Sequence, residues 1–234
     1  MSVSYAETRY GGLTVREAFR DERVAHMVEA ASRGDLGAVD AQIRAGADVN
    51  YMGTDGISPL LWVLVEGRHA HNLKGAEHLL KAGANPNYRD EKRKASAMAL
   101  AAGGDSPQIL ELLLKYKGDP NLIGPRGEPL LHIAAGEFRK ENIDLLLKYG
   151  VDINIHEKND STAAQVAARL GRFDITAYLL EKGLSYNLEG LAKSVEARRV
   201  PPNSEAQRWK DKVIEMLKER GVKFPAFTPR GITP

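Results

Sequence analysis

The sequence predicts an all-α fold in which helix–turn–helix units stack side by side as a solenoid. The first observation is a five-residue phrase, usually ending a helix, that recurs with spacings of 37, 34, 33 and 33 residues between its final asparagines. A period near 33 residues is typical of stacked supersecondary units. The five phrases are GADVN (46–50), GANPN (83–87), KGDPN (117–121), GVDIN (150–154) and GLSYN (183–187).

The second observation is a segment rich in small or apolar residues that begins eight or nine residues after each of four asparagines. These segments are SPLLWVL from Ser58, SAMALAA from Ser96, PLLHIAA from Pro129 and TAAQVAA from Thr162. The hydroxyls of Ser58 and Thr162 suit a helix N-cap, and Pro59 suits the first helical turn. The alanines that follow allow close packing. Trp62 occupies the apolar position of the first such helix and is expected in the core.

A second helix follows in each unit, with leucines at helical spacing in AEHLLKAG, ILELLLKYK, IDLLLKYG and ITAYLLEKG. Glycines are expected to end these helices in the left-handed conformation, and lysines lie in the last turns. The glycines are Gly83, Gly150 and Gly183. The asparagines that close the phrases are expected to form turns by bonding their own backbone.

One helix pair cannot bury both of its faces, so the end units must present a polar face to water. The sequence therefore divides into one continuous domain with capping and central units. We expect an N-terminal extension (1–21), an N-terminal capping repeat (22–50), four central repeats (51–187), C-terminal capping helices (188–224) and a tail (225–234).

Over residues 22–224 this pattern resembles the ankyrin repeat, with its T-P-L-H-x-A-A start and its L-L-x-x-G-A-D-x-N end. Leu131–Ala135 match the first motif closely, and His132 is expected to be a structural histidine. The second repeat has alanine at the histidine position and the fourth has Gln165, so less rigid contacts are expected there. More loosely, ETRYGGLTVREAF and GPRGEPLLH are similar to stand-alone ankyrin proteins of proteobacteria, some of which accompany secreted toxins.

Composition excludes several classes of function. The chain has no cysteine, so thiol catalysis, disulfides and cysteine-ligated zinc are ruled out. Its net charge of +2 and its 6% aromatic content do not suit nucleic-acid binding. No apolar run approaches the roughly 20 residues that span a bilayer. The start lacks a secretory signal as written, so the expected compartment is the periplasm if a signal sequence was removed and the cytoplasm otherwise.

Chemical motifs are also lacking, so we expect no enzyme and no cofactor. GISPL (56–60) lacks the second glycine of a nucleophile elbow, and neither a phosphate-binding loop nor H-E-x-x-H occurs. His69, His71 and His78 are close in sequence but lack further metal ligands. The charged stretch YRDEKRKAS (88–96) is either an exposed turn or a basic patch that faces a partner. The four-residue insertion in EGRHAHNLKG is either a tolerated loop or a further contact.

The resemblance implies that the concave face, made of finger residues and first-helix ends, binds a protein. Carried over by register, the expected contact residues are Tyr51, Met52, Asp55, Ile57, Glu66, Tyr88, Arg89, Lys92, Arg93, Ile123, Arg126, Glu128, Glu137, His156, Lys158, Asn159 and Arg169. The expected function is a monomeric protein-binding module, in its finer form an immunity protein that neutralises a secreted toxin. The alternative is a cytosolic scaffold or stress-related protein with an unrelated partner.

Overall fold

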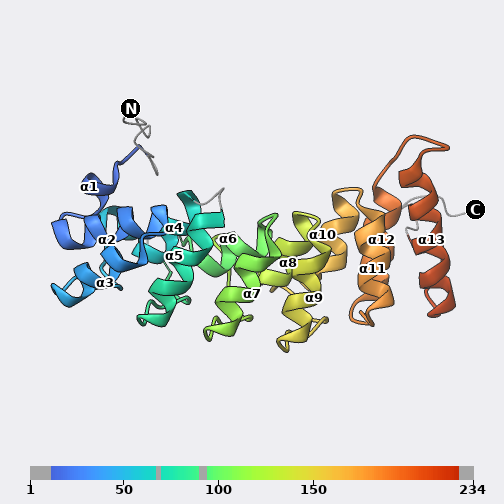
Figure 1. Ribbon diagram of the computed structural model, residues 1–234. Helices are drawn as coiled ribbons and strands as arrows, with labels where there is room; N and C mark the ends of the chain where they lie inside the picture. The colour runs from blue at the N-terminus through green and yellow to red at the C-terminus, as the bar shows by residue number, and fades with distance from the viewer. Residues whose placement is uncertain (1–11, 67–69, 90–93, 227–234) are drawn as a thin grey trace, which may run out of the picture. The chain divides into compact units, whose positions relative to one another are not determined.

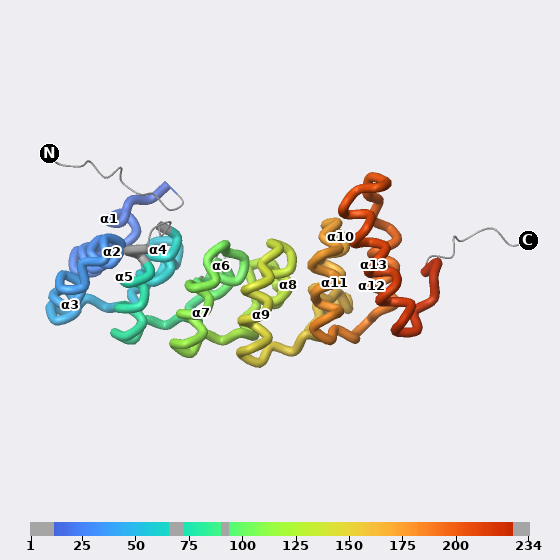
Figure 2. The backbone as a smooth tube through the Cα atoms, turned by 45° about the vertical axis from the view of Figure 1, so that its right-hand side comes forward, coloured from blue at the N-terminus to red at the C-terminus, as the bar shows by residue number. Residues whose placement is uncertain are grey.

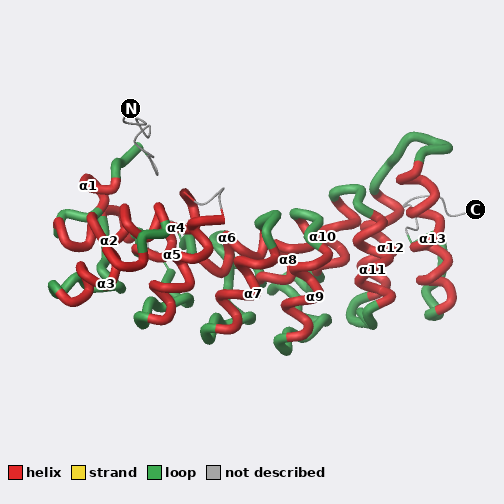
Figure 3. The backbone as a smooth tube through the Cα atoms, in the orientation of Figure 1, coloured by secondary structure: helices red, strands yellow, loops and turns green. Residues whose placement is uncertain are grey.

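The computed structural model describes residues 12–66, 70–89 and 94–226. Within these ranges the regular secondary structure is helical, and Figure 3 draws no strand there. The predicted all-α class is therefore confirmed. Backbone contacts divide the chain into two compact units, an N-terminal one of residues 1–100 with 108–119, and a C-terminal one of residues 101–107 with 120–234.

The N-terminal unit is built on α2, which packs against α3, α4 and α5 (Figure 1). Its elements are α1 (Val15–Ala18), α2 (Glu22–Arg33), α3 (Leu36–Arg44), the 3-10 turn η1 (Thr54–Gly56), α4 (Pro59–Glu66) and α5 (Ala70–Lys81). Two further helices, α6 (Ala97–Gly103) and α7 (Pro107–Lys115), each contain residues of both units. Trp62 is fully buried in α4, as the sequence predicted.

The segment before α2 packs on this unit. Thr14 caps α1 in a reciprocal pair with Glu17, and the Thr54 hydroxyl donates to the Glu17 carbonyl over 2.9 Å. The ring of Phe19 is 1% exposed and stands edge-on to Trp62, with 5.6 Å between ring centres. Burying an aromatic ring of this size stabilises a fold by about 2 kcal/mol, so the end of the N-terminal extension is part of the core.

The C-terminal unit repeats the helical hairpin. Its helices are α8 (Leu130–Gly136), α9 (Lys140–Lys148), α10 (Ala163–Arg169), α11 (Phe173–Glu181), α12 (Leu188–Ala197) and α13 (Glu205–Glu219). The middle helix α10 packs against α8, α11 and α12, and α11 packs against α13 (Figure 2). Fully buried alanines in α8 and α10 permit this close packing. The division into capping and central repeats stays a prediction.

Short fingers connect the hairpins. Three of them are closed by one antiparallel bridge each, namely Arg89 with Ser96, Ile123 with Pro129, and His156 with Thr162. The first helix then begins at a capped residue. The Ser58 hydroxyl accepts from the Leu61 amide, and Thr162 forms a capping box with Gln165. The predicted hairpin-like fingers and both predicted N-caps are thus confirmed.

The repeated asparagines act differently from our expectation. Asn50 accepts from the Asn85 amide over 2.8 Å and donates to the Gly83 carbonyl over 3.0 Å. Asn87 makes the same two bonds to Asp119 and Lys117. The residue two positions earlier makes the local turn bond instead. The asparagine therefore joins the loop of one repeat to the loop of the next, which explains its recurrence at the same place in the period.

Lys117 should be replaceable by glycine with a gain in stability. It has φ +66° at the position where the other repeats place Gly83, Gly150 and Gly183, all with φ above +90°. A side chain in this conformation costs about 1 kcal/mol relative to glycine. We expect Lys117→Gly to raise the free energy of unfolding by about 1 kcal/mol, measured by urea titration. A loss of stability would show that the lysine side chain makes compensating contacts.

Candidate functional site

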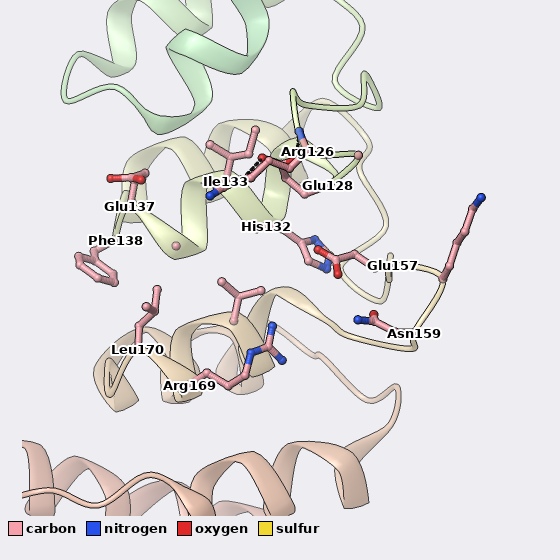
Figure 4. Close-up of a pocket in the computed structure, with 14 residues that line it drawn as sticks. Arg126, Glu128, His132, Ile133, Glu137, Phe138, Glu157, Asn159, Arg169 and Leu170 are labelled. Atoms are coloured by element: carbon pink, nitrogen blue, oxygen red, sulfur yellow. Dashed lines mark hydrogen bonds and ion pairs between the residues drawn. The ribbon is translucent and has the colours of Figure 1, made fainter. Parts of the chain in front are cut away.

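A groove opens in the C-terminal unit between two successive fingers and the first helices that follow them. Its volume is about 1010 Å³. The residues that line it are Arg126, Gly127, Glu128, His132, Ile133, Gly136, Glu137, Phe138, Glu157, Lys158, Asn159, Val166, Arg169 and Leu170. Figure 4 shows Phe138 and Leu170 at one end of the groove, and Glu157 and Asn159 at the other. The exposed apolar side chains therefore gather at one end, where Glu137 also lies.

A buried carboxylate shapes the finger that precedes α8. Glu128 is 8% exposed and accepts bonds from the Arg126 backbone amide over 2.7 Å and from the Arg126 side chain over 3.2 Å. The Gly124 amide donates to the Glu128 carbonyl over 2.7 Å. The Glu128 side chain thus holds the finger turn together. It leaves the exposed Arg126 as the finger's charged surface group.

His132 connects α8 to the next finger. Its Nε2 lies 2.8 Å from the Ser161 carbonyl oxygen, so this nitrogen carries the proton. Burial lowers the pKa of His132 below its ordinary value and keeps the ring neutral. Its Nδ1 is buried and has no hydrogen-bond partner among the described residues. The N-cap of α8 is Pro129, which has no hydroxyl to offer. The predicted structural role of His132 is confirmed.

The apolar end of the groove contains a strained aromatic residue. Phe138 is 37% exposed and has φ +63°, a left-handed conformation that a bulky side chain rarely adopts. The residue one period later is Gly171, with φ +78°. The Arg172 guanidinium lies 4.0 Å from the centre of the Phe138 ring, and Asp174 holds that guanidinium with two bonds. Together with the 48% exposed Leu170, Phe138 forms an exposed apolar end.

A smaller hollow of about 450 Å³ adjoins the groove on the side of α12. It is lined by Arg169, Lys193, Ser194, Ala197 and Arg198, and Arg169 lines both hollows. The Arg169 guanidinium donates to the Ser161 hydroxyl over 3.0 Å. We call this set the basic hollow, because its three charged lining residues are all cations.

The comparisons with known proteins agree with this architecture. Residues 98–190 match the family model for ankyrin repeats in three copies. Over 103 residues the chain is 30% identical to the ankyrin repeat and KH domain-containing protein mask-1 of Caenorhabditis elegans. That alignment covers 44% of this chain and 4% of the relative. Residues 98–190 of the chain therefore contain ankyrin repeats. Ankyrin repeats indicate a protein–protein interaction module, and in general they are not enzymes.

Six of the predicted contact residues line the groove. They are Arg126, Glu128, Glu137, Lys158, Asn159 and Arg169. Of these, Glu128 is buried and has little surface to offer a partner. Two other predicted contacts, Ile123 and His156, are exposed outside the groove lining. The His156 ring stacks on Tyr186 with 4.1 Å between ring centres.

The predicted contacts in the N-terminal unit are less uniform. Met52 is 64% exposed, whereas Ile57 is 3% exposed and belongs to the core beneath the first finger. Intermediate exposure is found for Tyr51, Asp55, Tyr88 and Arg89. Lys92, Arg93 and the side chain of Glu66 lie outside the described residues.

The histidines considered as metal ligands do not form a described site. His78 Nε2 lies 2.6 Å from Asp40 Oδ1, while His69 and the His71 side chain lie outside the described residues. Within the described part of the chain there is no group of three or more metal-binding side chains. No helix described there has the length and apolar character needed to cross a bilayer.

Sequence reasoning missed the residues of the apolar end and, apart from Arg169, those of the basic hollow. Ile133, Phe138 and Leu170 belong to first helices or follow them within two residues, where an apolar residue normally signals core packing. A signal was nevertheless present, because Phe138 lies one 33-residue period before Gly171. A phenylalanine at a glycine position of a repeat is a departure that invites a functional explanation.

Proposed function

We propose that this chain binds a protein partner in the groove of its C-terminal unit and acts by occupying that partner without catalysis. The observation that carries the proposal is Phe138. Its left-handed backbone costs of the order of 1–3 kcal/mol, and such strain is concentrated at functional sites. An exposed aromatic next to Leu170, beside arginines, also has the composition of an interface core.

The lack of cysteine allows a direct test. A single cysteine at Lys158, inside the groove, carries a photo-crosslinker, and a single cysteine at Lys148 serves as the control. Lys148 lies in the last turn of α9, at the opposite end of that helix from Phe138. We expect a partner from the source cells to be crosslinked from position 158 and not from position 148. Equal crosslinking from both positions, or none, would remove the groove as the binding site.

Two matched aromatic substitutions extend the test. Phe138 and Tyr149 are 37% and 36% exposed and lie before and after α9. Asparagine tolerates a left-handed backbone, so Phe138→Asn removes the ring with little added strain. Loss of a central aromatic anchor weakens protein binding by about tenfold or more. We expect this loss for Phe138→Asn and none for Tyr149→Asn, measured by titration against the crosslinked partner.

The finer proposal is that the partner is a secreted toxin and that this chain is its immunity protein. It is supported by the similarity of ETRYGGLTVREAF and GPRGEPLLH to stand-alone ankyrin proteins that accompany toxins. Co-expression with the product of the neighbouring gene should relieve toxicity, and Phe138→Asn should reduce the relief. If that product neither binds nor harms cells, the immunity role is refuted while the protein-binding role stands.

A further inference from the structure

The basic hollow contains cations that no ion pair with a described carboxylate neutralises. Elsewhere, basic side chains are paired at short range: Lys182 with Asp144 at 2.7 Å and Lys212 with Glu181 at 2.7 Å. No ion pair of this kind joins Lys193 or Arg198 to a carboxylate among the described residues. Both side chains are exposed. Three cations around one hollow repel one another, and a bound anion would relieve that repulsion.

The basic hollow continues into the apolar end of the groove. The Arg198 guanidinium lies over the turn at Gly171, where a Cβ atom would meet Arg198 Nε at 3.2 Å. Gly171 directly follows Leu170, the residue that lies beside Phe138 in Figure 4. A peptide segment bound across this turn would therefore reach from the apolar end to the cations within a few of its residues. The two kinds of surface form one continuous binding surface.

We propose that this surface receives an extended acidic segment of the partner protein, which rests on the proposed function. A large apolar side chain of the segment packs on Phe138 and Leu170. The aspartates or glutamates that follow it pair with Arg169, Lys193 and Arg198. Charge complementarity of this kind sets specificity and the association rate. The segment's chemistry is thus an apolar anchor adjoining a run of carboxylates.

The other lining charges favour a protein over a nucleic acid. Glu137 and Glu157 line the larger groove, where they would repel a continuously charged phosphate backbone. The residues that line the basic hollow, where the carboxylates of the segment pair, include no acidic side chain. Nucleic-acid sites also present aromatic rings along a basic channel, so that successive bases stack. Here one exposed ring, Phe138, lies at the apolar end of the groove, and the basic hollow is lined by Ser194 and Ala197 besides its cations. Carboxylates from a protein segment suit that separation.

The test uses the full chain and three fluorescent peptides: a glutamate-rich peptide with one phenylalanine, the same peptide with serine in place of the phenylalanine, and a lysine-rich counterpart. Binding is followed by fluorescence anisotropy at low and high salt. We expect the first peptide to bind best and to weaken as salt rises. A single-stranded oligonucleotide is the competitor, and its binding more tightly than the first peptide would overturn the proposal.

Charge-reversal variants test whether the basic hollow is where the first peptide binds. Lys193→Glu combined with Arg198→Glu should weaken the first peptide by about tenfold or more, while Lys148→Glu should leave its affinity unchanged. Phe138→Asn should abolish the preference for phenylalanine over serine. A double charge reversal with unaltered affinity, or a lysine-rich peptide that binds equally well, would refute the inference. Circular dichroism of each variant checks that its helices are retained.

The crosslinked partner separates this inference from the proposed function. If crosslinking from position 158 persists unchanged in the double charge-reversal variant, the acidic segment is refuted and groove binding stands. If crosslinking does not distinguish positions 158 and 148, the proposed function itself has failed. If crosslinking from position 158 occurs in the parent chain and is lost in the double variant with its helices intact, the proposed function and the acidic segment are both supported.

Discussion

Gly75→Ala is expected to destabilise the N-terminal unit by about 3 kcal/mol or more. Gly75 lies on α5, where that helix crosses α2 at Ala31. A Cβ atom on Gly75 would stand 2.0 Å from the Ala31 carbonyl oxygen and 2.7 Å from its carbonyl carbon. These are backbone atoms of a fully buried residue, so no side chain can move aside. The two helices must separate, and the packing between them is lost.

The chain carries its own probes for this measurement. It has two tryptophans, Trp62 in the N-terminal unit and Trp209 in the C-terminal unit. With fluorotryptophan incorporated, one fluorine resonance reports each unit through a single urea titration. The Trp62 transition should move to lower urea in Gly75→Ala. Because the two units need not unfold together, separate probes are preferable to one global signal.

Gly37→Ala is the matched control. Gly37 lies in α3 of the same unit, is exposed, and an added Cβ atom would meet only Asp35 Oδ1, at 3.8 Å. Alanine is the better helix former, so this change should stabilise by up to about 1 kcal/mol. If the two substitutions behaved alike, the close crossing of α2 and α5 would be disproved.

Much of the fold follows from local chemistry that the sequence displays. The hydroxyls of Ser58 and Thr162 cap helices, and glycines end the second helices. These interactions lie within one repeat, and they recur with the 33-residue period. Such features are readable because they involve neighbours along the chain. Helix positions, N-caps, fingers and the burial of Trp62 could therefore be predicted without coordinates.

The features that escaped prediction depend on how repeats face one another. The asparagine bond from Asn50 to Gly83 spans a whole repeat, and nothing at Asn50 alone distinguishes it from a local turn. Phe138 was missed for a different reason. An exposed phenylalanine and a buried one look alike in sequence, and a positive φ is visible only in the backbone. The candidate site was thus predicted in several of its charged residues, but its apolar end, Lys193 and Arg198 were missed.

Asn142 illustrates the same limit inside the C-terminal unit. It is 1% exposed, and its Nδ2 lies within 3.0–3.1 Å of the carbonyl oxygens of Ala101, Ala102 and Gly104. Arg139 donates to the Gly103 carbonyl over 3.1 Å. Helix ends leave carbonyls without partners, and here the start of α9 supplies donors to the end of α6.

Asn142→Asp is expected to destabilise the C-terminal unit by about 3–5 kcal/mol at neutral pH. The change keeps the side chain's shape but replaces two N–H donors with a carboxylate that faces three carbonyl oxygens. Asn142→Ile removes the donors without adding charge. Isoleucine is the residue that the next repeat has at the equivalent position, Ile175. It should cost less, about 1–3 kcal/mol. The fluorine resonance of Trp209 through a urea titration measures both.

The pH dependence of Asn142→Asp provides the sharpest check. Burial among carbonyl oxygens raises the pKa of the introduced carboxyl in the folded state above its unfolded value near 4. The folded state then binds more protons than the unfolded state, so stability rises as pH falls through the folded pKa. The protonated carboxyl also regains one donor for the α6 carbonyls. We expect the difference from the parent chain to shrink between pH 7 and pH 4, whereas the difference for Asn142→Ile stays constant. Parallel pH profiles for the two variants would show that the Asn142 side chain does not face those carbonyls.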